Sequence, residues 1–124
     1  MIKHTILLAE DEIEIAENII ARLEVEGYTV IYAEDGKKAV DAAVNVKPHV
    51  ILLDAMLPRI DGFEVCKILK KNPHTNHIPI LFLTSLNAVG DVEKAMSAGA
   101  DDYLTKPFEY NRLLAKISRY LPHA

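Results

Sequence analysis

Residues 50–62 constrain the fold more than any other part of the chain. The four apolar residues 50–53 predict a strand buried on both faces, as in the middle of a parallel sheet. The run stops at Asp54, because a buried strand does not carry an unpaired charge into its interior. Pro58 and the Asp61–Gly62 pair then break the backbone before the next helix. Asp54 is therefore expected at the carboxyl end of a central strand, where open parallel sheets bind their ligands.

The rest of the chain repeats the pattern of a short buried strand followed by an amphipathic helix. Apolar or β-branched runs predict the strands, and apolar residues at helical spacing predict the helices between them. This alternation predicts a doubly wound α/β domain over residues 1–124, with a parallel sheet covered on both faces, but leaves the strand order open. The expected strands are residues 6–9, 28–33, 50–53, 78–83 and 101–104.

Two of the helices carry expectations about single residues. After Asp61, apolar residues at helical spacing face inward, and Cys66 among them is expected to fill the core. The lysines of that helix are expected on its solvated face: Lys67, Lys70 and Lys71. The next helix is short, and its weakly apolar face is expected to contain Val92, Ala95 and Met96.

Composition excludes several classes of function. The chain has 14 Lys and Arg against 18 Asp and Glu, a net charge of -4, and no basic run, which argues against direct nucleic-acid binding. Its single cysteine cannot form an intramolecular disulfide and fits a reducing compartment. The apolar runs are too short to span a membrane, and the N-terminus lacks the hydrophobic region of a signal peptide. We therefore expect a cytoplasmic domain with no membrane contact.

Polar residues with complementary chemistry follow four of the expected strands. Glu10 and Asp11 follow the first strand, Asp54 the third, Thr84 the fourth and Lys106 the fifth. In a parallel sheet these ends lie at one edge, where crowded carboxylates favour a bound cation. Oxygen ligands without His or Cys indicate a hard ion such as Mg²⁺, and a lysine and a hydroxyl opposite it could hold phosphoryl oxygens. An aspartate can itself act as the nucleophile and form an aspartyl phosphate.

Each of these residues also has an ordinary structural interpretation. An acid at a strand end most often caps a helix, and acids are favoured in the first turn of a helix. Thr84 could satisfy a backbone group, and Lys106 alone would be a surface charge. Because all of them fall at the same edge with complementary chemistry, the functional interpretation is the stronger one.

The residues at the strand ends belong to four motifs: Leu-Leu-Ala-Glu-Asp-Glu at 7–12, Leu-Leu-Asp at 52–54 with Met-Leu-Pro and Asp-Gly after it, Leu-Thr-Ser at 83–85, and Ala-Asp-Asp-Tyr-Leu-Thr-Lys-Pro-Phe at 100–108. In this order the motifs resemble the receiver domain of two-component response regulators, the family typified by the chemotaxis response regulator. The resemblance spans essentially the whole chain. It implies a flavodoxin-like sheet of strand order 2-1-3-4-5, with helices on both faces and a Mg²⁺ site at the strand ends.

Carried onto this sequence, the resemblance implies a role for each residue at the edge. Asp54 would accept a phosphoryl group from the phosphohistidine of a histidine kinase or phosphotransfer protein, as in a phosphorelay. Lys106 would pair with the phosphoryl oxygens, and its bond to Pro107 would be cis. The implied Mg²⁺ ligands are Asp11, Asp54, the backbone carbonyl of Met56, and Glu10 through water.

The resemblance also implies a switch. Thr84 resembles the hydroxyl that moves toward the phosphoryl group, and Tyr103 the aromatic that turns inward behind it. The movement would reshape the face made by the fourth helix, the fifth strand and the fifth helix, which a downstream effector protein reads. The domain would not be an enzyme but a phosphoacceptor that assists its own phosphorylation and dephosphorylation, with phosphorylation-dependent homodimerisation as one output.

Other functions fit the sequence less well. A phosphatase that uses an aspartyl phosphate often needs a second aspartate two residues beyond the nucleophile, where this chain has Met56. A flavin-binding domain would need a phosphate-binding loop after the first strand, where acidic residues 10–12 would repel a phosphate. Two alternatives stay open: a degenerate receiver that acts only by dimerising, and a receiver excised from a larger regulator or hybrid kinase rather than a stand-alone protein.

Overall fold

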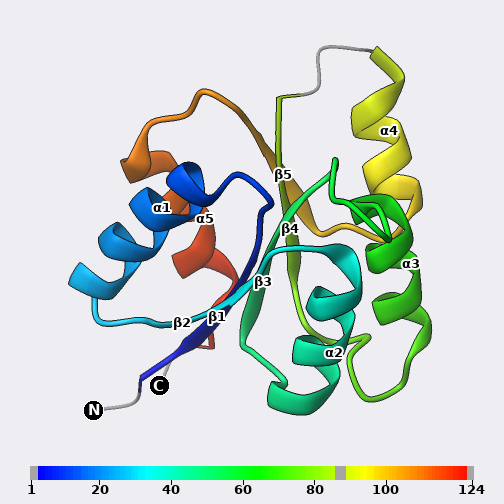
Figure 1. Cartoon of the computed structure of the whole chain (residues 1–124), viewed down its shortest axis with the longest axis horizontal. Coiled ribbons are helices and arrows are strands. Elements are labelled where there is room, and N and C mark those ends of the chain that lie inside the picture. Colours follow the sequence, from blue (N-terminus) through cyan, green and yellow to red (C-terminus); the bar gives the residue numbers. More distant parts are fainter. Residues whose placement is uncertain (1–2, 86–88, 123–124) are drawn as a thin grey trace.

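Five parallel strands alternate with five helices in the computed structural model, which describes residues 3–85 and 89–122 (Figure 1). The strands are β1 (Thr5–Ala9), β2 (Thr29–Ala33), β3 (Val50–Asp54), β4 (Ile80–Thr84) and β5 (Asp102–Thr105). The helices are α1 (Ile13–Val25), α2 (Gly36–Val46), α3 (Gly62–Lys71), α4 (Val89–Ser97) and α5 (Tyr110–Tyr120). All five predicted strands are present, and each end lies within two residues of the predicted one.

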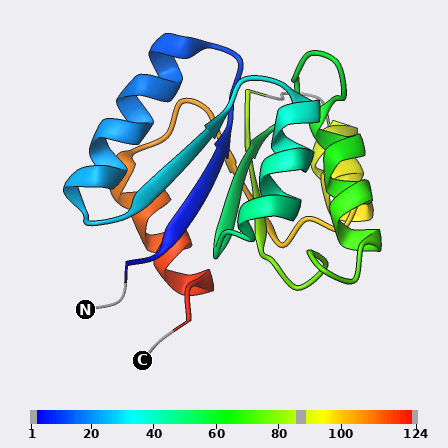
Figure 2. The ribbon, with the colours of Figure 1, turned by 60° about the horizontal axis from the view of Figure 1, so that its bottom comes forward.

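The strand order is β2-β1-β3-β4-β5, with every neighbouring pair parallel. This order confirms the one that the family resemblance implied. β3 lies in the middle of the sheet (Figure 2), and each of its residues is buried, as its apolar run predicted. Asp54 is the last residue of β3 and pairs in register with Leu83 of β4.

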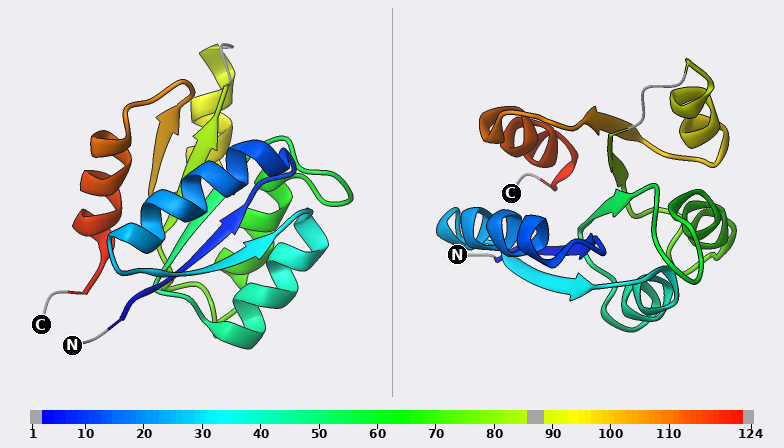
Figure 3. Two further views of the ribbon diagram at one scale, coloured as in Figure 1. Left: turned by 60° about the vertical axis from the view of Figure 1, so that its left-hand side comes forward. Right: turned by 45° about the horizontal axis from the view of Figure 1, so that its top comes forward.

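Helices cover both faces of the sheet, and each face has its own core. Figure 3 shows α1 and α5 on one side and α2, α3 and α4 on the other. The core under α1 and α5 includes Leu8, Leu52 and Ile117, and the core under the other three helices includes Leu53, Phe63 and Phe82. Full burial of a large aliphatic or aromatic side chain contributes about 1.5 to 3 kcal/mol. The two cores therefore fix the sheet between its helical layers.

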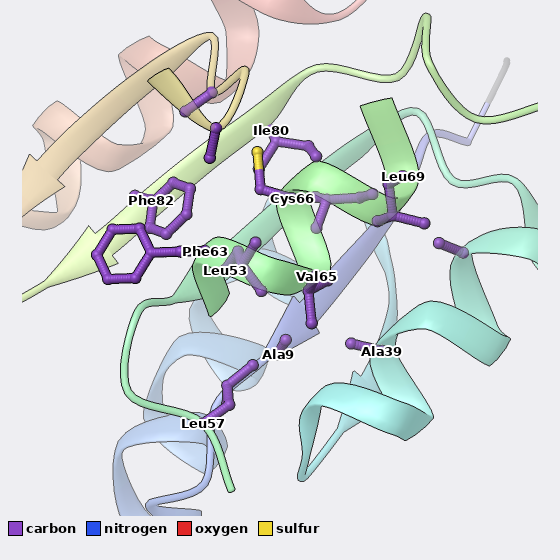
Figure 4. Close-up of a cluster of buried hydrophobic side chains, with 14 of the residues drawn as sticks. Ala9, Ala39, Leu53, Leu57, Phe63, Val65, Cys66, Leu69, Ile80 and Phe82 are labelled. Carbon is purple, nitrogen blue, oxygen red and sulfur yellow. The ribbon is translucent and has the colours of Figure 1, made fainter. Parts of the chain in front are cut away.

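The core under α2, α3 and α4 is drawn in Figure 4. The rings of Phe63 and Phe82 stack with centroids 5.4 Å apart and join α3 to β4. Cys66 lies between α3 and the sheet and is fully buried, as expected of a core residue. Burial raises the pKa of its thiol to about 11, so it stays protonated and inert at neutral pH.

Side-chain caps start two of the helices that border the site. The Asp35 side chain accepts a hydrogen bond from the Lys38 amide at 2.8 Å and caps α2. Asp61 caps α3 in the same way, through the Glu64 amide at 2.9 Å. Both helices therefore begin at a glycine that directly follows a capping aspartate.

Two single-residue predictions are wrong. Lys70 is not on a solvated face: its ammonium group donates to the carbonyl of Ile78 at 2.8 Å and to the Asp101 carboxylate at 2.9 Å. The Ile78 carbonyl comes from the loop between α3 and β4, and the Asp101 carboxylate from the residue just before β5, neither of which helical spacing reveals. Met96 is 45% exposed rather than inward-facing, since α4 contacts the core through Ala95, with Ala98 packing there just after the helix ends. Within the described residues, no helix is long and apolar enough to cross a membrane.

Candidate functional site

Asp54 ends the central strand and is almost buried. Its carboxylate is 8% exposed, at the edge where β3 gives way to the following loop. The Met56 amide donates a hydrogen bond to Asp54 Oδ1 at 3.1 Å, which orients one carboxylate oxygen. The other oxygen, Oδ2, faces Lys106 at 3.3 Å from Nζ. The predicted position of Asp54 at the carboxyl edge is therefore the observed one.

Lys106 reaches the same point from the far end of the sheet. It follows β5, and its amide donates to the Thr84 carbonyl at 2.7 Å, which ties the loop after β5 to the end of β4. The bond to Pro107 is cis, as the family resemblance implied. Its ammonium group lies 2.5 Å from Glu10 Oε1 as well as 3.3 Å from Asp54 Oδ2, so one cation joins two acidic side chains.

Three consecutive acids follow β1. Carboxylate oxygens of Glu10, Asp11 and Glu12 all lie within 4.8 Å of one another. Glu10 is buried, whereas Asp11 and Glu12 are exposed, so the group has an inner and an outer side. Its hard oxygen donors suit a divalent cation such as Mg²⁺. Asp54 does not belong to this group of three acids, but Lys106 forms ion pairs with both Asp54 and Glu10 and so connects them.

The buried carboxylates shift the proton equilibria of the site. Burial and the neighbouring Asp54 raise the pKa of Glu10 from 4.5 to about 7, although Lys106 acts in the opposite direction. Burial disfavours the charged form of Lys106, but the hydrogen bond to Glu10 and the charge of Asp54 outweigh it and raise the pKa of the lysine. Lys106 therefore stays protonated, and Glu10 is the group at this edge that titrates near neutral pH.

A cavity of ≈ 600 Å³ opens over these groups. Asp11, Asp54, Ser85 and Lys106 form its polar part, beside Met56. An apolar wall from α1 and the loop before α5 completes it, with Ile15, Ile19, Pro107, Phe108 and Tyr110. Of these residues, all but Pro107 also pack against the core under α1 and α5. The sequence alone did not reveal the wall, because it combines segments about 90 residues apart.

Thr84 ends β4, and Tyr103 lies on the neighbouring edge strand β5. Thr84 is buried at the end of β4, next to Ser85, which lines the cavity. Tyr103 lies on β5 opposite Phe82 and is 38% exposed. Paired residues of parallel strands point to the same face of the sheet, so Tyr103 points to the same face as Phe82. Thr84, two residues after Phe82, points to that face as well. Tyr103 and Thr84 therefore share the face that α4 covers. The structure thus brings Asp54, Lys106 and Glu10 into contact and leaves Tyr103 at the surface.

Comparison with known protein families identifies the class. The sequence model of the response regulator receiver domain matches residues 6–118. Solved structures agree: the receiver domain of a sensor histidine kinase from Pseudomonas aeruginosa, with magnesium in its active-site cleft, has a TM-score of 0.90 and 34% identity, covering 96% of this chain and 98% of its own. A chemotaxis response regulator of Vibrio cholerae has a TM-score of 0.90 and 30% identity, covering 97% and 100%.

The chain therefore belongs to the response regulator receiver domain family, whose members serve phosphorylation-based two-component signalling. It is 42% identical over 116 residues to the DNA-binding dual master transcriptional regulator RpaA of Synechocystis, a match that covers 94% of this chain and 48% of the regulator. It is 41% identical over 112 residues to the response regulator PleD of Caulobacter vibrioides, covering 90% of this chain and 25% of PleD. The chain spans about half the length of the first regulator and a quarter of the second.

Proposed function

We propose that Asp54 accepts a phosphoryl group from the phosphohistidine of a histidine kinase or phosphotransfer protein. The observation that carries this proposal is the position of the Asp54 carboxylate, at the end of the central strand and paired with Lys106 at 3.3 Å. An Asp54 oxygen attacks phosphorus, the phosphorus–nitrogen bond breaks, and the departing imidazole takes up a proton. Residues 1–124 act as one receiver domain that assists its own phosphorylation and dephosphorylation.

The neighbouring residues prepare this transfer. Lys106 neutralises charge that develops on the phosphoryl oxygens, and the apolar wall formed by Ile15, Phe108 and Tyr110 shields one side of the site from water. The residues that would hold Mg²⁺ are Asp11, Asp54, the Met56 carbonyl, and Glu10 through water. When bound, Mg²⁺ supplies positive charge that offsets the negative charge of the carboxylates and the phosphoryl group.

A switch follows from the same arrangement. The Thr84 hydroxyl moves toward the phosphoryl group, and Tyr103 turns inward into the space behind it. Tyr103 is 38% exposed in the structure, and this supports the proposal because the ring starts from the outward position that an inward turn requires. The face made by α4, β5 and α5 then changes shape and is read by an effector protein, by a second copy of the domain, or by both.

In this proposal the domain acts through protein partners and does not itself bind nucleic acid. Its net charge of -4 and the acidic site support protein partners in the cytoplasm. Its relatives place receiver domains both in response regulators and in a sensor histidine kinase, so either context fits a domain of this kind. A degenerate receiver that acts only by dimerising is the competing proposal.

Intact mass after incubation with acetyl phosphate tests the proposal. Wild-type protein should gain one phosphoryl group when Mg²⁺ is present and none when the metal is chelated. Asp54→Asn, which keeps the shape of the side chain, should gain none under either condition. Absence of any gain in the wild type, under conditions where an established receiver reacts, would favour the dimer-only alternative.

A further inference from the structure

The loop between β3 and α3, residues 55–61, is held from two sides by the first turns of helices. We call it the acceptor loop, because it directly follows Asp54. The Gly62 amide at the start of α3 donates to the Ala55 carbonyl at 2.9 Å, and the Gly36 amide at the start of α2 donates to the Pro58 carbonyl at 3.1 Å. The first amides of a helix have no partner within it, so each helix uses one of them to hold the acceptor loop.

Both helices approach the loop so closely that only glycine fits. A Cβ atom at residue 36 would stand 1.7 Å from the carbonyl oxygen of Ile60, and one at residue 62 would stand 2.2 Å from that of Asp54. Separations this short overlap the backbone itself and cannot be relieved by turning a side chain. Gly36 is therefore required by space and not by backbone conformation, because its φ is not positive.

The hydrogen bonds to the carbonyls of Ala55 and Pro58 fix the orientation of the Met56 peptide group that lies between them. Among the backbone hydrogen bonds of the described residues, the acceptor loop uses the carbonyls of Ala55, Pro58 and Asp61 and not that of Met56. The Met56 amide is fixed at the same time by its bond to Asp54 Oδ1 at 3.1 Å. With the residues on either side held, the Met56 carbonyl is left available beside the acidic group that follows β1.

We propose that Gly36 is a positioning residue for the metal site: by docking the acceptor loop on α2, it aims the Met56 carbonyl at the divalent cation. The inference rests on the proposed function, in which that carbonyl is a ligand. Groups that orient a metal ligand without touching the metal change its affinity when they are replaced. Gly36 suits the test better than Gly62 because Gly62 contacts the backbone of Asp54 itself.

The experiment compares Gly36→Ala with Gly90→Ala. Gly90 lies in α4, and a Cβ atom there would meet nothing within 4 Å, so it makes a matched control. Two quantities are measured: the Mg²⁺ dissociation constant by titration, and, in Mg²⁺-free protein, hydrogen exchange of the residue 36 amide. In Gly36→Ala the dissociation constant should rise about tenfold and the amide should exchange faster. Gly90→Ala should match the wild type in both.

The outcomes separate this inference from the proposed function. A wild-type protein that fails to bind Mg²⁺ would overturn the metal site and the inference together. A Gly36→Ala protein that binds Mg²⁺ as the wild type does, with its amide freed, would overturn the inference alone. If Gly36→Ala does not fold, Ile60→Ala loosens the same loop where it packs on the core. Mg²⁺ should then bind more weakly to Ile60→Ala than to the wild type. Ile117→Val, a change in the core on the other face of the sheet, is the control and should leave the Mg²⁺ affinity unchanged. Unchanged affinity in Ile60→Ala would overturn the inference.

Discussion

Lys106 bonds two acidic side chains at once, and this contact determines how the site responds to pH. Glu10 Oε1 and Asp54 Oδ2 lie 2.5 Å and 3.3 Å from the lysine nitrogen. Glu10 is almost completely buried, and its other carboxylate oxygen accepts a hydrogen bond from the Glu12 amide at 3.3 Å. Burial raises the pKa of Glu10 to about 7, so this side chain takes up a proton as the pH falls through neutrality.

The first prediction concerns the pH dependence of stability without Mg²⁺. The pKa of Glu10 is raised from 4.5 to about 7, so between these values the folded protein holds a proton that the unfolded chain has released. The contribution of Glu10 to the free energy of unfolding should therefore be fully present below pH 4.5 and be lost, by about 3 kcal/mol, as the pH rises to about 7. Denaturant unfolding of the wild type and of Glu10→Gln at several pH values between 4.5 and about 7 measures this pH dependence. The same pH dependence in both proteins would contradict the assignment.

The second prediction separates folding from switching. Lys106→Ala leaves Glu10 and Asp54 without their cation, but Glu10 can take up a proton, so the free energy of unfolding should fall by only about 1 to 2 kcal/mol. The response of Tyr103 to beryllium fluoride, a mimic of a bound phosphoryl group, should be lost. Fluorine NMR of fluorotyrosine-labelled protein measures this response as a change in the chemical shift of the Tyr103 ring. If the variant is unfolded, Lys106 is structural and its proposed role is wrong.

At the scale of elements, Lys70 joins three parts of the chain at the end of the sheet far from the site. From α3 it donates to the Ile78 carbonyl and to Asp101, whose carboxylate also accepts the Ile80 amide at 2.8 Å. The end of α3, the loop before β4 and the start of β5 therefore share one ammonium group. Its side chain is only 17% exposed, so when the lysine is removed water replaces it only in part as the donor to these acceptors.

The third prediction follows from this contact. Lys70→Met keeps the length of the side chain but removes the donor, and should lower the free energy of unfolding by about 1 to 3 kcal/mol. Lys67→Met, on the exposed side of the same helix, should leave it nearly unchanged. Urea unfolding monitored by circular dichroism compares the two. Equal effects would mean that the hydrogen bonds of Lys70 do not contribute to stability.

The elements also show what a sequence can and cannot reveal. Apolar runs and helical spacing predicted the strands, the helices and the edge where Asp54 lies, because these depend on local pattern and on the rules of parallel sheets. The inward position of Cys66 followed from the same pattern. Lys70 and Met96 were misplaced because their surroundings come from segments distant in sequence. The bond between Glu10 and Lys106, 96 residues apart, could be expected only as proximity at one edge.

At the scale of the whole molecule, the candidate site and the hydrophobic cores occupy different parts of the sheet. The two cores enclose the strands, while the acids, Lys106 and the cavity lie together at the carboxyl edge. The acceptor loop and the start of α2 connect this edge to one of the cores. Charge can therefore change at the edge without unfolding the layers beneath, which a phosphorylation-controlled domain requires.

The most direct test of the account identifies the residue that carries the phosphoryl group. Protein treated with acetyl phosphate and Mg²⁺ is reduced with borohydride, which converts an aspartyl phosphate into homoserine, and the position of the homoserine is read by peptide mass spectrometry. The account predicts homoserine at residue 54 and at no other aspartate. Homoserine at residue 11 or 61 instead, or none in protein whose intact mass has gained a phosphoryl group, would contradict it.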